Sequence, residues 1–137
     1  MKTIPIVAVA VLALGMAGCK GTGPRPPSES CPGFEQAGST RSLVREKVQY
    51  LGSPDVDVRE LRCVLDDGLL RIDVDLENDK SRNQQVEYRF LWFEPNGMSV
   101  GPEEAWKPLV LYPDERRTIR TVAPSVRALD FQLILKR

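Results

Sequence analysis

The strongest constraint on the fold is a stretch in which apolar and charged residues alternate strictly. From Leu70 to Glu77, every second residue is leucine, isoleucine or valine, and the residues between them are arginine, aspartate or glutamate. A period of two is typical of a β-strand with one buried face and one solvated face. The chain must therefore build a sheet and a second layer that covers the apolar face of this strand.

Neighbouring segments predict more strands of the same kind. Asp66-Asp67-Gly68 is typical of a hairpin turn and would join residues 56–65 to this strand. Residues 86–94 carry aromatic side chains on one face and partly apolar side chains on the other, which predicts a central strand. Residues 43–50 fit a helix or a strand equally well. Shorter strands are expected at 98–100, 109–112, 117–122 and 128–135.

These segments predict the class of the fold. We expect residues 43–137 to form a mainly β domain, an immunoglobulin-like antiparallel β-sandwich of about seven strands. A domain of this size buries only about 60 to 65 per cent of its unfolded surface, so covalent links would add usefully to its stability.

The amino terminus predicts export and lipid attachment. Lys2 precedes an apolar run that is much shorter than the roughly 20 residues of a membrane-spanning helix. Met16-Ala17-Gly18-Cys19 resembles the lipobox of bacterial lipoproteins, in which the cysteine is acylated and becomes the first mature residue. We therefore expect a signal peptide at 1–18 and lipid on Cys19. The alternative is an ordinary cleaved signal that happens to contain a cysteine.

The segment after Cys19 predicts a tether and a location. Residues 19–42 are rich in glycine, proline, serine and threonine, a composition that does not bury enough apolar surface to fold. Several acyl chains on one residue provide stable membrane anchoring. Lipoproteins retained at the inner membrane usually carry aspartate after the cysteine, whereas this chain has Lys20. The resemblance implies a lipid anchor in the outer membrane, on its periplasmic face.

The three cysteines allow one further covalent link. Lipidation of Cys19 would leave Cys31 in the tether and Cys63 in a predicted strand, and an oxidising periplasm would permit a disulfide between them. Such a bond would stabilise the fold by roughly 3 to 4 kcal/mol in the chain-entropy model. The sequence leaves a second alternative open, in which Cys63 is a buried free thiol and Cys31 is incidental.

Composition excludes several functions. The chain has no histidine, which removes Ser-His-Asp catalysis and imidazole metal ligands, and we expect no cofactor and no metal. Its 19 basic and 19 acidic side chains balance, so binding to nucleic acid is not expected. Gly97-Met98-Ser99-Val100-Gly101 matches the G-x-S-x-G pattern of hydrolases, but it lacks the following helix and the histidine base. The glycines are better explained by turns.

Acidic side chains on the wet face of the alternating strand suggest one enzymatic alternative. Asp73, Asp75 and Glu77 lie on the same strand face at a spacing that glycoside hydrolysis can use. A solvated face with ion pairs to Arg59 or Arg71 explains the same pattern more simply. We therefore name no catalytic residues and expect a protein that is not an enzyme.

Two features are candidates for recognition of a partner. Trp106 lies in a proline-bounded loop, where an aromatic plane is suited to docking on a protein or a sugar. Arginine side chains near the carboxyl end are suited to carboxylate or phosphate groups. The structural alternatives are a tryptophan that caps the core and a charged strand edge that prevents aggregation. The arginines concerned are Arg116, Arg117, Arg120 and Arg127.

The chain also resembles a known family. A lipobox, the segment Leu69 to Asn78 and the aromatic segment Val86 to Phe93, with Asn96-Gly97 after it, are similar to the YcfL-like lipoproteins of Gram-negative bacteria. The resemblance implies an immunoglobulin-like sandwich of unknown function, without catalytic residues. We therefore predict a non-catalytic binding module whose partner is an envelope protein or a cell-wall component. The alternatives are a cell-wall hydrolase that uses the strand carboxylates and a purely structural envelope protein.

Overall fold

The computed structural model describes residues 40–137 of the chain, with side chains from residue 43 onward. These residues form one short helix and seven strands. The predicted signal peptide, Cys19, Cys31 and nearly all of the predicted tether lie outside the described residues. The elements in chain order are α1 (Thr40–Lys47), β1 (Val48–Leu51), β2 (Asp57–Asp66), β3 (Leu69–Glu77), β4 (Gln84–Phe93), β5 (Lys107–Leu111), β6 (Arg116–Val122) and β7 (Asp130–Lys136).

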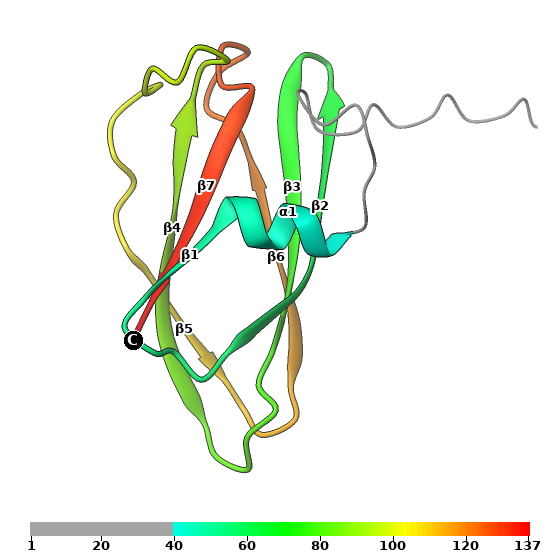
Figure 1. Cartoon of the computed structure of the whole chain (residues 1–137), viewed down its shortest axis with the longest axis vertical. Coiled ribbons are helices and arrows are strands. Elements are labelled where there is room, and N and C mark those ends of the chain that lie inside the picture. The colour runs from blue at the N-terminus through cyan, green and yellow to red at the C-terminus, as the bar shows by residue number, and fades with distance from the viewer. Residues whose placement is uncertain (1–39) are drawn as a thin grey trace, which may run out of the picture.

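The strands form two sheets that face each other across the core (Figure 1). The four-stranded sheet has the order β1-β7-β4-β5, and the three-stranded sheet has the order β2-β3-β6. The mainly β sandwich predicted from the sequence is confirmed, and its division into four and three strands is that of seven-stranded immunoglobulin-like domains. In the described part of the chain, β1 and β7 run parallel, whereas the other paired strands are antiparallel. The predicted antiparallel sheet therefore has one parallel edge.

The alternating residues of β3 determine where the core lies. Leu70, Ile72, Val74 and Leu76 are completely buried, as the period of two predicts. They face the aromatic side of β4, a central strand between β7 and β5, where the rings of Phe90 and Trp92 stack 5.7 Å apart. Other buried residues complete this core, namely Val56, Val58, Leu61, Val86, Leu111, Ile119, Ala123, Ala128, Phe131, Leu133 and Leu135.

The ambiguous segment at 43–50 is a helix followed by a strand. α1 occupies its first part, where Leu43 and Val44 pack against the core, and β1 occupies the rest. Lys47 at the end of α1 donates a hydrogen bond of 2.6 Å to Asp130 on β7. Figure 1 shows α1 crossing from one sheet to the other on the side where β1 and β2 are the edge strands. The helix therefore closes this side of the sandwich and directs β1 onto the edge of β7.

The connection between β4 and β5 differs from the sequence prediction. The sequence predicts a strand at 98–100, but only Ser99 forms an isolated bridge, with Phe93. Gly97 and Gly101 both have positive φ, at 86° and 74°, and they turn the chain on either side of Ser99. The prediction of a strand is wrong, whereas the prediction that these glycines serve turns is confirmed.

Candidate functional site

The outer face of the three-stranded sheet is covered with ion pairs between neighbouring strands. At its centre, Asp75 on β3 accepts two hydrogen bonds from Arg62 on β2, at 2.8 and 3.2 Å. The hydroxyl of Thr118 on β6 donates to the same carboxylate at 2.6 Å. Register explains the arrangement, because Asp75 lies opposite Thr118, and Arg62 lies opposite the adjacent outward-facing Asp73. We call this outer surface of β2, β3 and β6 the ion-paired face.

The lowered pKa values of Asp75 and Glu77 do not favour the general-acid role that the enzymatic alternative requires. The hydrogen bonds from Arg62, followed by that from Thr118, hold the pKa of Asp75 below its usual range. Hydrogen bonds from Arg116 and then Arg59 lower the pKa of Glu77 in the same way. A glycosidase general acid needs a raised pKa, so these carboxylates are suited to ion pairing rather than proton donation.

The structure distributes the four predicted arginines over different places and gives each a carboxylate. Arg116 pairs with Glu77 at 3.0 Å, and Arg120 lies 3.5 Å from Asp73 on the ion-paired face. Arg117 pairs with its neighbour Glu115, and Arg127 pairs with Glu94. Arg127 also lies apart, because it follows β6 in the connection to β7. These side chains therefore do not form a single patch of unpaired positive charge.

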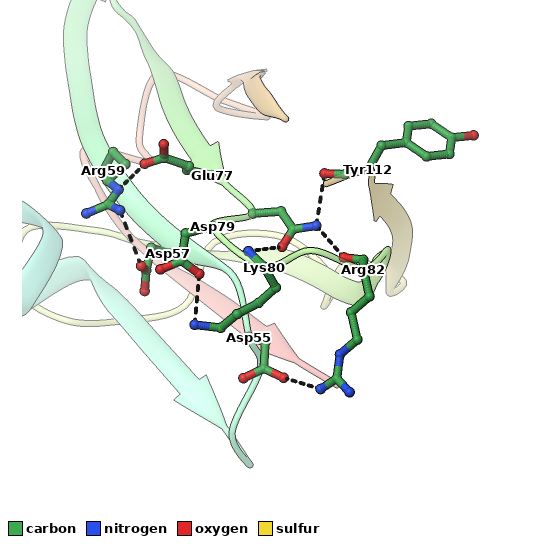
Figure 2. Close-up of polar contacts among 9 residues, drawn as sticks. Asp55, Asp57, Arg59, Glu77, Asp79, Lys80, Arg82 and Tyr112 are labelled. Atoms are coloured by element: carbon green, nitrogen blue, oxygen red, sulfur yellow. Dashed lines mark hydrogen bonds and ion pairs between the residues drawn. The ribbon is translucent and has the colours of Figure 1, made fainter. Parts of the chain in front are cut away.

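A buried asparagine at the end of β3 links the two sheets. Asn78 is completely buried, and its side-chain amide donates to the carbonyls of Arg82, Leu111 and Tyr112 at 2.8 to 3.1 Å. Its side-chain oxygen accepts from the Lys80 N–H at 3.0 Å. Figure 2 shows the contacts with Lys80, Arg82 and Tyr112 beside the exposed ion pairs that surround them. Since β3 and β5 belong to different sheets, Asn78 is a structural link rather than a ligand group.

Trp106 lies on the outer face of the four-stranded sheet. Lys107, the first residue of β5, lies opposite Tyr88 on β4. Its side chain is therefore on the same side of the sheet as that of Tyr88, which packs against the core. The preceding residue, Trp106, therefore lies on the opposite side, beside the outward-facing Arg89. Trp106 does not belong to the core that the described residues form, so this tryptophan does not cap the core. Its side chain is partly exposed.

Two cations hold the Trp106 ring against the sheet. The guanidinium carbon of Arg89 on β4 lies 4.3 Å from the ring centre, and the Lys136 ammonium on β7 lies 4.2 Å from it. Such cation–π contacts are each worth roughly 0.5 to 2 kcal/mol, depending on exposure. Arg89 also pairs with Glu103, and Lys136 pairs with Glu87 at 2.9 Å. We call these residues and the adjoining outer surface of β4, β5 and β7 the tryptophan face.

A hollow of about 280 Å³ adjoins this face between β4 and the loop at 94–106. Its apolar wall includes the outward-facing Leu91 and Phe93 on β4, together with Val100 and Pro102 on the loop. Glu103, which pairs with Arg89, also lines the hollow. The tryptophan face therefore combines a partly exposed aromatic ring, a cation and a recess lined by both apolar and polar residues.

Glu104 fixes the loop that carries Trp106. It accepts a hydrogen bond of 2.9 Å from the Trp92 indole and one of 3.0 Å from Lys107. Burial acts to raise the pKa of Glu104, but the hydrogen bonds from Trp92 and then Lys107 outweigh it, and the pKa lies below its usual value. An ionised carboxylate thus anchors the loop to a core side chain.

Sequence reasoning identified Trp106 but missed Arg89, Glu103 and Lys136. One signal was available, because Arg89 interrupts the partly apolar second face of the aromatic strand. The pairing with Glu103 depends on the path of the loop, which no local pattern reveals.

Cys63 lies on β2 and packs against the core, while its proposed disulfide partner lies outside the described residues. Within residues 40–137 no group of three acidic or cysteine side chains is placed to hold a metal, and no helix is long and apolar enough to cross a membrane.

Comparisons with known proteins agree with this fold. A crystal structure of Campylobacter jejuni cj0090 is similar at 22% identity and a TM-score of 0.56, covering 66% of this chain and 96% of that one. A crystal structure of a DUF1425 family member from Shewanella sp. pv-4 is similar at 26% identity and a TM-score of 0.56, covering 61% of this chain and 79% of that one. No curated protein gives a significant match. Residues 43–137 match the family model described as "Protein of unknown function (DUF1425)", and the chain therefore belongs to the DUF1425 family.

Proposed function

We propose that this protein is a non-catalytic binding module of the bacterial cell envelope, anchored by lipid on Cys19 and facing the periplasm from the outer membrane. The lipobox, Lys20 and the composition of 19–42 support the anchor and its location. The similarity to YcfL-like lipoproteins remains part of this proposal and is narrower than membership of the DUF1425 family. The partner would be an envelope protein or a cell-wall component.

One observation carries the binding role, namely that Trp106 is held partly exposed outside the core. A tryptophan fixed by Arg89 and Lys136 has little conformational freedom to lose when a partner binds. Tryptophan and arginine are the residues that most often dominate interface energies. The ion-paired face is less suited to binding because β3 and β6, which form much of it, contribute no aromatic side chain.

Site-specific photo-crosslinking in intact cells tests this surface. A photoreactive residue at Val110, on the outer side of β5, should trap a discrete partner, and Trp106→Ala should abolish the product. The matched control places the photoreactive residue at Arg120 on the ion-paired face, where no such product is expected. A single product that survives Trp106→Ala would contradict the proposed surface. Absence of any product, together with an envelope permeability defect in the deletion strain, would favour a purely structural protein.

Metabolic labelling tests the anchor separately. The wild-type chain should incorporate labelled fatty acid and sediment with outer membranes, whereas Cys19→Ala should incorporate none. Label retained by Cys19→Ala would refute the anchor.

Peptide mapping of the same purified material tests the proposed bond between Cys31 and Cys63, which would appear as one disulfide-linked peptide. In the alternative, the Cys63 thiol would react with an alkylating reagent when the protein is unfolded without reduction.

A further inference from the structure

The guanidinium of Arg89 is only partly satisfied by the residues around it. Its Nη2 atom pairs with Glu103, whereas its Nε atom is buried and has no hydrogen-bond acceptor among residues 40–137. Nε and Nη2 are adjacent donors of the planar fork that binds both oxygens of a carboxylate. A buried donor without an acceptor costs about 1 to 3 kcal/mol. A carboxylate that moved Glu103 aside and reached this covered nitrogen would gain a second hydrogen bond that Glu103 lacks.

Glu103 is easily exchanged for such a carboxylate. Its side chain is 61% exposed, while that of Arg89 is only 19% exposed. Exposed partners of ion pairs contribute little to stability, so displacement of Glu103 costs little. Lys136, near the same ring, adds a second positive group to the site.

The hollow beside Glu103 indicates what such a carboxylate would carry. A volume of about 280 Å³ lined by Leu91, Phe93, Val100 and Pro102 suits one apolar side chain. Because Glu103 lines this hollow and also pairs with Arg89, a group that replaced it would have its carboxylate at the guanidinium and apolar space alongside.

We propose that Arg89 and this hollow form a receptor for the free carboxyl end of a peptide whose last residue is apolar. The ligand carboxylate takes the place of Glu103 on Arg89, and the last side chain enters the hollow. This inference rests on the proposed binding function and names the chemistry of the partner at the tryptophan face.

Titration of the purified full-length protein with short peptides tests the receptor, with tryptophan fluorescence as the signal. N-acetyl-Gly-Leu should bind saturably, and the same peptide with a carboxyl-terminal amide, or N-acetyl-Gly-Asp, should bind at least tenfold more weakly. Equal affinity for acid and amide, or no saturation by the acid up to 10 mM, would overturn the proposal.

Two variants separate recognition from a structural role. Glu103→Gln should tighten the binding of N-acetyl-Gly-Leu several-fold, because it removes the internal competitor and leaves Arg89 in place. Arg89→Lys keeps the positive charge but lacks the two adjacent N–H donors that bind both oxygens of a carboxylate, so it should weaken binding about tenfold. The control Glu60→Gln removes a partner of Arg62 on the ion-paired face and should change nothing. Unchanged or weaker binding by Glu103→Gln would overturn the receptor.

The outcome is distinguishable from failure of the proposed function. If the crosslinked product depends on Trp106 but acid and amide peptides bind alike, the carboxylate receptor is wrong and the binding module stands. If no product depends on Trp106 and no peptide binds, both are wrong.

Discussion

The two outer faces of the sandwich carry similar residues but use them differently. On the ion-paired face, Asp75 receives hydrogen bonds from neighbours on both adjacent strands. On the tryptophan face, Arg89 has one exposed carboxylate partner, and its Nε atom has no acceptor among the described residues. This difference is the reason why we propose binding at the tryptophan face, since the number of charged residues alone does not distinguish the two surfaces. What matters is whether the fold already satisfies the hydrogen-bonding capacity of those charges.

The largest predicted effect is that of removing the Asn78 side chain, and it tests whether the two sheets unfold together. Asn78→Ala removes four side-chain hydrogen bonds, three donated to the carbonyls of Arg82, Leu111 and Tyr112 and one accepted from the Lys80 N–H. We expect a loss of about 3 kcal/mol in the free energy of unfolding. Urea unfolding followed by fluorescence and circular dichroism should show one shared transition. The exposed neighbour Asn83→Ala is the control and should change stability by less than about 0.5 kcal/mol. Separate transitions for the two signals would show that the sheets unfold independently.

An intermediate effect is expected at the anchor of the tryptophan face. Glu104→Gln weakens charged hydrogen bonds to Trp92 and Lys107 and should cost about 1 to 2 kcal/mol at neutral pH. Because the folded-state pKa of Glu104 is lowered, its contribution is present above the unfolded value near 4.5 and is lost as pH falls through the folded pKa. The free energy of unfolding, measured from pH 7 to pH 3, should thus fall less steeply with pH in the variant than in the wild type. An equally steep acid limb in the variant and the wild type would refute this role.

The smallest effect is expected on the ion-paired face. Arg62→Gln removes the two hydrogen bonds to Asp75 and the pair with Glu60, but these groups are largely exposed. We expect a loss of about 0.5 to 1 kcal/mol, which salt should reduce further. Unfolding in 0.05 and 0.5 M NaCl measures this. Glu104→Gln should retain most of its effect at high salt because the Glu104 side chain is only 25% exposed and its partner Trp92 is buried. A salt-insensitive loss in Arg62→Gln would remove the contrast between the two faces.

Local patterns predicted most of the fold because the alternation along a strand does not depend on distant parts of the chain. The buried residues of β3, the hairpin at Asp67-Gly68 and the central position of β4 all agree with periodicity and turn preference. Residues 43–50 resisted prediction because the helix ends and the strand begins within the same short segment. The strand expected at 98–100 failed because two turning glycines outweigh the strand preference of the residues between them.

For the site, the sequence by itself singled out Trp106, placed charged residues on one strand face and ruled out histidine chemistry. These conclusions depend only on residue type and spacing. Only the tertiary structure showed that the predicted arginines contact carboxylates and that, among residues 40–137, Arg89 Nε has no acceptor. Only the tertiary structure placed Glu103, the partner of Arg89, at the wall of a hollow. The physical reason is that hydrogen-bond satisfaction depends on partners brought together across strands and loops, whereas strand alternation is a property of adjacent residues.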